Sequence, residues 1–120
     1  MDTPALAQGI PLIPLEALAP DSARGLEVRL GDEVLPLILV RHRQGVSAFR
    51  NRCPHAGTPL DWMPDAFFNL EGTHLQCATH AALFDPVDGA CVAGPCAGEA
   101  LETFPVEIDE EGMVRLMVSR

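Results

Sequence analysis

The sequence has 120 residues, 48% of them hydrophobic, and carries 17 acidic against eight basic side chains for a formal net charge of −9. This length and composition predict one folded domain, residues 1–120, and argue against a disordered chain. The negative charge argues against binding to nucleic acid or anionic lipid, and the absence of 18 consecutive apolar residues argues against a membrane span.

The N-terminal stretch from Met1 to Ala19 is apolar but contains Asp2 and Glu16 and has no Lys or Arg. Signal peptides begin with a basic segment, so this stretch is not predicted to be one, and we expect a cytoplasmic protein. In a reducing compartment the four cysteines are expected to be metal ligands or thiols and not a disulfide framework.

The first half of the chain predicts an antiparallel meander. Residues Gly25–Leu30 alternate between apolar and polar, as a half-buried strand does, whereas Leu37–Val40 is continuously apolar and is expected to be buried on both faces. Pro11 places the first strand at a sheet edge. The predicted elements are a strand at Ile10–Ile13, a helical turn at Leu15–Ala19, and strands at Gly25–Leu30, Leu37–Val40 and Val46–Phe49.

Two short arms then each combine a cysteine with a histidine, Cys53 with His55 and Cys77 with His80. Thiolate and imidazole ligands suit zinc or iron–sulfur chemistry and argue against calcium or magnesium. Structural zinc sites usually use Cys-x-x-Cys or paired histidines, so the narrow Cys-x-His arm favours iron. A [2Fe-2S] cluster with two cysteines on one iron and two histidines on the other needs one of each from both arms.

The chain resembles the Rieske ferredoxin family over most of its length. The residues that carry the resemblance are Cys53-Pro54-His55, Cys77-Ala78-Thr79-His80, Phe84, Asp88-Gly89 and Gly94-Pro95. Two features differ from the family pattern: the spacer between His55 and Cys77 is a few residues longer, and Ala81 stands where glycine is common.

The resemblance implies an all-β fold of antiparallel sheets, with a small cluster-binding subdomain at about residues 51–96 formed by two ligand loops. It also implies that Cys53, His55, Cys77 and His80 bind a [2Fe-2S] cluster, and that Gly94-Pro95 lies in a loop covering it. High-potential Rieske proteins place a serine and a tyrosine, both hydrogen-bond donors to the cluster, where this chain has Ala82 and Phe84.

The remainder of the chain predicts supporting structure. The aromatic residues Trp62, Phe67 and Phe68 of the spacer are expected to pack against the base of the ligand loops. The further predicted elements are strands at Leu75–Gln76 and Ala82–Phe84, a hairpin turn at Asp88-Gly89 into Ala90–Val92, and a hairpin of Thr103–Ile108 with Met113–Val118.

Four further side chains of metal-binding type remain. Cys91 and Cys96 could form a disulfide or serve a redox role, but small buried apolar residues are the favoured interpretation. His42 and His74 have no cysteine at ligand spacing and are expected to be exposed strand residues.

The resemblance implies a soluble one-electron carrier that passes electrons from a reductase to a terminal oxygenase and is not itself an enzyme, with a monomer favoured. An alternative is the small Rieske-like subunit of a nitrite reductase or a similar oxidoreductase. A second alternative, of a different class, is a zinc-stabilised interaction module.

Overall fold

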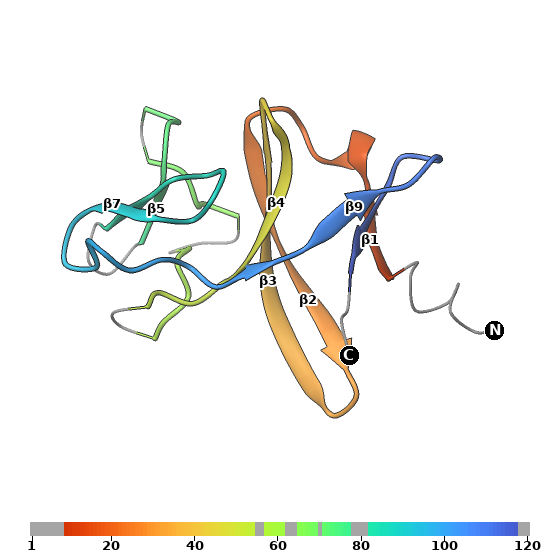
Figure 1. The fold of residues 1–120 in the computed structure, drawn as a ribbon, viewed down its shortest axis with the longest axis horizontal. Coiled ribbons are helices and arrows are strands. Elements are labelled where there is room, and N and C mark those ends of the chain that lie inside the picture. The colour runs from red at the N-terminus through yellow and green to blue at the C-terminus, as the bar shows by residue number, and fades with distance from the viewer. Residues whose placement is uncertain (1–8, 55–56, 62–64, 70, 78–81, 118–120) are drawn as a thin grey trace.

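The computed structural model describes residues 9–54, 57–61, 65–69, 71–77 and 82–117. These residues form ten β-strands and one short 3-10 turn, and each strand runs antiparallel to its partners (Figure 1). The prediction of an all-β fold of antiparallel sheets is therefore confirmed. No helix within these ranges has the length and apolar character that a membrane span requires.

The elements follow the predicted meander closely in the first half of the chain and are shorter in the second half. In chain order they are β1 (Ile10–Pro14), η1 (Leu15–Ala17), β2 (Ser22–Leu30), β3 (Glu33–His42), β4 (Gly45–Arg50), β5 (Leu75–Gln76), β6 (Leu83–Phe84), β7 (Cys91–Ala93), β8 (Thr103–Phe104), β9 (Val106–Ile108) and β10 (Met113–Leu116).

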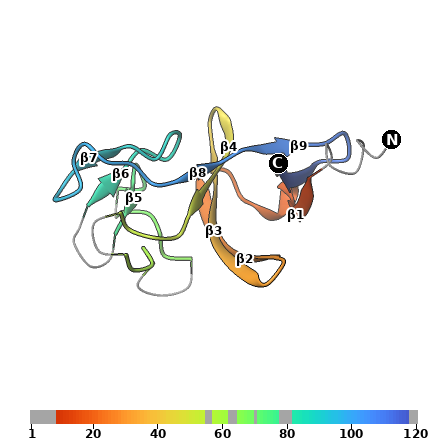
Figure 2. The same ribbon diagram turned by 60° about the horizontal axis from the view of Figure 1, so that its bottom comes forward.

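The strands form a sheet of order β1-β10-β9, a sheet of order β2-β3-β4-β8, and a sheet of order β5-β6-β7. The first two sheets, which we call the sheet end, stand apart from the third in Figures 1 and 2. The third sheet and the loops between Asn51 and Leu101 form the loop end. As predicted, β1 is an edge strand, and its pairing with β10 shifts register between Pro11 and Ile13.

A hydrophobic core joins the two sheets of the sheet end. Leu39 of β3 and Ala48 of β4 meet Val114 of β10 in one buried cluster, and a second buried cluster contains Leu37 and Leu116. Burial of this apolar surface is the main favourable contribution to the stability of such a two-layer arrangement.

Strand β3 also forms part of a second core on its other face. Side chains alternate across a strand, so Ile38 and Val40 point away from the sheet-end core and pack with Phe49, Phe67 and residues of the loop end. All residues from Leu37 to Val40 are fully buried, which confirms the prediction that this strand is buried on both faces. Strand β3 thus connects the two ends of the molecule.

The predicted single strand Thr103–Ile108 is wrong, because the chain changes sheets at Pro105. Residues before it pair with β4 as β8, and residues after it pair with β10 as β9. Proline has no N–H to donate to a ladder, and the Pro105 carbonyl instead accepts a hydrogen bond from Met117 N–H at 2.9 Å. This crossing carries the chain from the four-stranded sheet to the three-stranded sheet of the sheet end (Figure 2).

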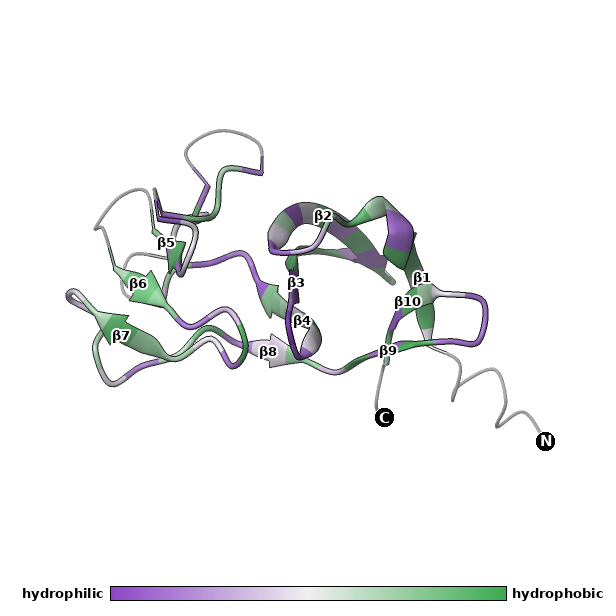
Figure 3. Ribbon diagram, turned by 90° about the horizontal axis from the view of Figure 1, so that it is seen from above, coloured by the Kyte–Doolittle hydropathy of each residue, from purple (hydrophilic) through white to green (hydrophobic). Residues whose placement is uncertain are grey.

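The sheet of the loop end has strands of only two or three residues. Figure 3 shows mainly hydrophobic residues on β6 and β7, in keeping with their contribution to the second core. The predicted turn at Asp88-Gly89 is confirmed: Gly89 has φ +78°, and a Cβ there would lie 2.8 Å from Phe49 on β4. Strand β7 begins at Cys91, one residue later than predicted.

The aromatic spacer packs against both ends of the molecule. Phe67 is 1% exposed in the second core, and Phe68 packs at its margin, which confirms the prediction for these two residues. Asp65 accepts a hydrogen bond from Gly25 N–H of β2 at 2.7 Å. The prediction for Trp62 lies outside the described residues.

Candidate metal centre

The first arm is a tight loop that begins at Cys53. The Cys53 N–H donates to the Thr58 carbonyl at 2.8 Å, and Gly57 N–H donates back to the Cys53 carbonyl at 2.7 Å. Gly57 has φ +76°, a conformation that glycine adopts without the steric cost paid by other residues. These bonds close the first arm into a short loop between Cys53 and Thr58.

Asn51 fixes the base of this first arm. Its side-chain oxygen accepts from Leu60 N–H at 2.8 Å, and its amide donates to an oxygen of Asp61 at 3.1 Å. Its own N–H donates to the Pro36 carbonyl at 2.9 Å, which ties the arm to the start of β3. The sequence analysis did not identify this role, because no local pattern indicates that residues nine or ten apart meet.

The second arm closes in the same way as the first. The Cys77 N–H donates to the Ala82 carbonyl at 2.9 Å, so both arms are closed by a cysteine N–H bonded five residues ahead. Strands β5 and β6 lead into and out of this loop, with Gln76 paired to Leu83. The two predicted arms are therefore closed by the same kind of hydrogen bond, although their sequences share only the cysteine and the histidine.

A third loop, at residues 94–99, contacts both arms. A Cβ at Gly94 would lie 2.8 Å from the Ala82 Cα, so the loop backbone rests directly on the end of the second arm. The Cys96 Sγ is 3.8 Å from the Cys53 Sγ of the first arm. These contacts agree with the expectation that the Gly94-Pro95 loop lies over the site.

Both predicted cysteine ligands lie in one apolar core. Cys53 and Cys77 are each 0% exposed and belong to the same buried cluster, together with Ala82 and Phe84. No polar or charged side chain is buried among the described residues. His55 and His80 lie outside the described residues, so the predicted set of four ligands remains a prediction.

This donor set fits an iron–sulfur cluster. Two buried thiols in matched loops supply the soft sulfur ligands that such clusters take, and the apolar surroundings exclude water from them. Within the described ranges no group of three or more His, Cys, Asp or Glu side chains is arranged to hold a metal ion, and the candidate centre contributes two cysteines to these ranges. Cys53 and Cys77 are therefore the members of the predicted ligand set that the structure describes.

The two remaining cysteines have the burial that the sequence predicts. Cys91 is 7% and Cys96 1% exposed, and no disulfide joins any of the four cysteines. The sequence analysis missed the contact of Cys96 with Cys53. The available signal was its position directly after Gly94-Pro95, the segment that the resemblance places over the cluster.

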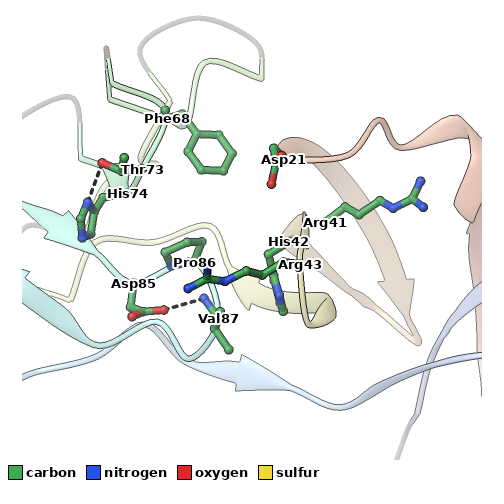
Figure 4. A pocket seen from close by; sticks show the side chains of 11 residues that line it. Asp21, Arg41, His42, Arg43, Phe68, Thr73, His74, Asp85, Pro86 and Val87 are labelled. Atoms are coloured by element: carbon green, nitrogen blue, oxygen red, sulfur yellow. Dashed lines mark hydrogen bonds between the residues drawn. The ribbon is translucent and has the colours of Figure 1, made fainter.

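His42 and His74 lie away from the arms, in a cavity of about 380 Å³ between the sheet end and the loop end (Figure 4). The prediction that both are exposed is wrong, since both are half-buried. His42 ends β3, whereas His74 precedes β5 and contacts Thr73 Oγ1 through its Nδ1 at 2.9 Å. Residues of the spacer and of the turns line this cavity and partly bury both histidines. Local sequence patterns do not reveal such contacts.

The hydrogen bonds of His42 fix its tautomer. Ser47 Oγ donates to the Val87 carbonyl at 2.7 Å, so it accepts from His42 Nε2–H, also at 2.7 Å. The Gln44 N–H donates to His42 Nδ1 at 3.1 Å. Burial lowers the pKa of His42, and the nearby Asp85 carboxylate opposes this in part. His42 is therefore a neutral structural residue that links β3 to the loop end through Ser47.

Comparison with known proteins identifies the family. The sequence profile of the Rieske [2Fe-2S] domain matches residues 11–105, which is most of the chain. The chain belongs to the Rieske [2Fe-2S] domain family. Its cofactor is accordingly a [2Fe-2S] cluster, and the chain is an iron–sulfur electron-transfer domain.

One relative by sequence is a proposed Rieske subunit of a respiratory nitrate reductase from Haloferax mediterranei. It is 33% identical over 100 residues, which cover 72% of this chain and 42% of that protein. The chain spans less than half the length of the curated relatives it matches.

Solved structures share the Rieske fold at low sequence identity. The ferredoxin of carbazole 1,9a-dioxygenase from Nocardioides aromaticivorans IC177 has a TM-score of 0.65 and 24% identity, covering 90% of this chain and 97% of that chain. A proposed small subunit of an NADH-dependent nitrite reductase from Mycobacterium tuberculosis has a TM-score of 0.62 and 23% identity, covering 88% of this chain and 90% of that chain. At these identities the likeness shows the fold alone.

Proposed function

We propose that this Rieske protein is a one-electron carrier that passes electrons from a reductase to a terminal oxygenase. The observation that carries the proposal is the pair of buried cysteines, Cys53 and Cys77, held by matching loops within one core of a Rieske domain. We further propose His55 and His80 as the other two ligands, since each lies on the same arm as one of these cysteines.

The cluster, when bound, accepts and donates a single electron, and imidazole ligands raise its potential above that of a four-cysteine cluster. The residues of this chain supply the frame for that chemistry. The Cys53 and Cys77 loops hold the sulfur ligands within the core, and the loop at residues 94–99 covers one side. A frame that changes little between redox states favours electron transfer, because little reorganisation accompanies each step.

The fold and the charge support an oxygenase partner. The dioxygenase ferredoxin of Nocardioides aromaticivorans shares the fold over 97% of its length. The formal net charge of −9 favours steering toward basic surfaces on redox partners and disfavours nucleic acid. The rate of reduction by the partner reductase is therefore expected to fall as ionic strength rises, and a rate that rises with salt would contradict this steering.

A second candidate is a Rieske subunit of a nitrate or nitrite reductase. It is favoured by the 33% identity with the proposed nitrate reductase subunit of Haloferax mediterranei. The two candidates differ in assembly: a carrier purifies alone and exchanges electrons with a separate reductase, whereas a subunit co-purifies with its enzyme at fixed stoichiometry.

The proposal includes the organisation of the chain. Residues 1–120 are proposed as one domain, with the cluster-binding subdomain at about residues 51–96, and a monomer is favoured. Cytoplasmic location is supported by the four cysteines, none of which forms a disulfide.

The deciding experiment begins with metal analysis of protein purified without oxygen. Two irons and two acid-labile sulfides per chain are expected, whereas zinc without iron would support the zinc-stabilised module and end the carrier proposal. Holo protein is then mixed with NADH, a ferredoxin reductase and a Rieske oxygenase, and turnover of the oxygenase is measured. Co-purification with a reductase core, without coupling to the oxygenase, would favour the subunit candidate instead.

A further inference from the structure

Cys96 lies against the sulfur of a proposed cluster ligand. Its Sγ is 3.8 Å from the Cys53 Sγ, and the side chains are 1% and 0% exposed. This separation is far longer than the roughly 2.05 Å of a disulfide and falls within the range of a hydrogen bond between sulfur atoms. The contact joins the loop at residues 94–99 to the first arm.

Cluster binding decides the direction of this hydrogen bond. In the metal-free protein either thiol could be the donor. A cysteine that binds iron does so as a thiolate and has no proton to give. Cys53 is then only an acceptor, and the S–H of Cys96 is left as the donor.

We propose that Cys96 is a positioning residue whose S–H donates a hydrogen bond to the ligand sulfur of Cys53 and thereby favours the reduced cluster. The proposal rests on the proposed role of Cys53 as a ligand. It assigns to Cys96 a task that neither the family resemblance nor the sequence comparisons assign.

The third loop holds Cys96 in place for this contact. Glu99 N–H donates to the Cys96 carbonyl at 2.8 Å, and Ala97 N–H donates to the Gly94 carbonyl at 3.2 Å. Gly94 in turn rests on Ala82 of the second arm, so the loop is fixed at both sides of the site. A thiol presented by such a loop reaches the sulfur of Cys53 at little entropic cost on cluster binding.

The sign of the effect follows from charge. Reduction adds one electron and makes the ligand sulfur a better acceptor, so the hydrogen bond is stronger in the reduced state. The buried surroundings strengthen the effect, because a hydrogen bond in a region of low dielectric is electrostatically stronger than one in water. A thiol is a weak donor, which keeps the expected shift modest.

Cys91 provides a matched control in the same core. It is 7% exposed, and its Sγ donates to the Ala93 carbonyl at 3.2 Å and not to a proposed ligand. Replacing either cysteine by alanine removes one buried thiol of the same size from the same cluster. Only the loss of Cys96 removes the donor to Cys53.

The test compares the reduction potentials of wild type, Cys96→Ala and Cys91→Ala by protein-film voltammetry. For Cys96→Ala the equilibrium constant of reduction is expected to fall about threefold, which is about 28 mV at 59 mV per tenfold for one electron. Cys91→Ala should match wild type. An unchanged potential in Cys96→Ala with the cluster intact would overturn the proposal, as would equal shifts in both variants.

Infrared spectroscopy tests the bond without a substitution. Once Cys53 and Cys77 bind iron, the S–H stretching region should contain only the bands of Cys91 and Cys96. Electrochemical reduction should move the Cys96 band to lower frequency and leave the Cys91 band in place, and the alanine variants assign the two bands. A Cys96 band that does not respond to reduction would overturn the proposal, even if Cys96→Ala failed to assemble the cluster.

The outcomes separate this inference from the proposed function. Zinc in place of iron in the wild-type protein defeats the carrier proposal, and the inference with it. A normal iron and sulfide content combined with an unaffected potential defeats only the role of Cys96.

Discussion

The sheet end and the loop end of this Rieske protein owe their order to different sources. Strands β2 and β3 pair along nine consecutive positions, from Ser22 with Arg41 to Leu30 with Glu33. In the loop end, β5 and β6 pair at only two positions, and single backbone hydrogen bonds, such as Cys53 N–H to Thr58 and Cys77 N–H to Ala82, close the loops. Regular pairing therefore orders the sheet end, whereas the loop end depends on turns, a buried core and its cofactor.

This difference predicts how each end responds to loss of the cluster. Binding of a metal cofactor to a site that the unfolded chain lacks contributes directly to folding free energy. Because both predicted cysteine ligands lie in the loop-end core, that contribution falls mainly on the loop end. The sheet end has its own core between two sheets and should retain its structure.

The largest expected effect is therefore loss of the cluster. Alanine at Cys53, His55, Cys77 or His80 removes one of four proposed ligands and should abolish the visible spectrum and the iron content. Hydrogen exchange should then accelerate in the loop end and stay slow in β2 and β3. The measurements are iron and sulfide analysis together with exchange resolved by residue.

His42→Ala and His74→Ala are the controls for the ligand variants. Both residues lie in the cavity between the two ends and not on an arm. Both variants should keep the cluster spectrum. Loss of the cluster in either one, or its retention in any of the four ligand variants, would show that the ligand assignment is wrong.

The second expected effect distinguishes two glycines of the third loop. Gly94 and Gly98 have similar φ angles of +99° and +95°, so alanine is strained at both. A Cβ at Gly94 would lie 2.8 Å from the Ala82 Cα, whereas a Cβ at Gly98 would meet nothing within 4 Å. Gly94→Ala should therefore cost about 1–3 kcal/mol more than Gly98→Ala in denaturant unfolding of the holo protein.

Equal costs for the two variants would mean that backbone strain alone matters and that the third loop is not pressed against the second arm. Loss of cluster in Gly94→Ala, with Gly98→Ala unaffected, would agree with the close contact. The difference between the two variants reports on packing, because both replace a glycine by alanine in the same loop and at a similar φ angle.

The same contrast separates what the sequence could predict from what it could not. The apolar run from Leu37 to Val40 indicated a strand buried on both faces, because strand periodicity is a local signal. Strand exchange at Pro105 was missed, since an apolar segment containing one proline does not reveal that its two halves pair with different sheets. The family resemblance supplied the fold as a whole.

For the candidate centre too, features that depend on neighbouring residues could be predicted, whereas contacts between distant segments could not. Cys53 and Cys77 could be proposed as ligands because each has a histidine within three residues along the chain. The contact of Cys96 with Cys53 spans 43 positions and depends on how three loops meet, which no short pattern encodes. The half-burial of His42 and His74 also depends on the junction between the two ends.

The third prediction concerns the reduction potential, which should lie at the low end of the Rieske range of about −150 to +300 mV. Ala82 and Phe84 occupy positions where high-potential members have donors, and both are fully buried in the same core as the cysteines. A hydrogen bond of about 0.5–3 kcal/mol corresponds to at most roughly 20–130 mV at 59 mV per 1.4 kcal/mol. Ala82→Ser and Phe84→Tyr should each raise the potential within that limit.

Protein-film voltammetry measures these shifts, with iron content as the check that the cluster is present. A wild-type potential well above zero would contradict the prediction, and so would two loaded variants with unmoved potentials. A low potential suits transfer to an oxygenase and does not suit oxidation of quinol.

The smallest expected effect tests the junction between the two ends through pH. Burial lowers the pKa of His42 from its ordinary value of about 6.5, with Asp85 opposing. Below pH 6.5 the unfolded chain therefore binds more protons at this residue than the native protein does. The contribution of His42 to the free energy of unfolding is therefore fully present above pH 6.5, and it is lost as the pH falls toward the lowered native pKa.

His42→Gln should remove this component, because glutamine can bond to Ser47 and Gln44 without titrating. The loss of unfolding free energy between pH 7.5 and 5.5 should be smaller in His42→Gln than in wild type, by at most about 1 kcal/mol for a partly solvated group. Carboxylates that titrate in both proteins cancel in the difference. A wild type that became more stable than the variant on acidification would show that the native protein favours the protonated imidazolium of His42, and would contradict a pKa lowered by burial.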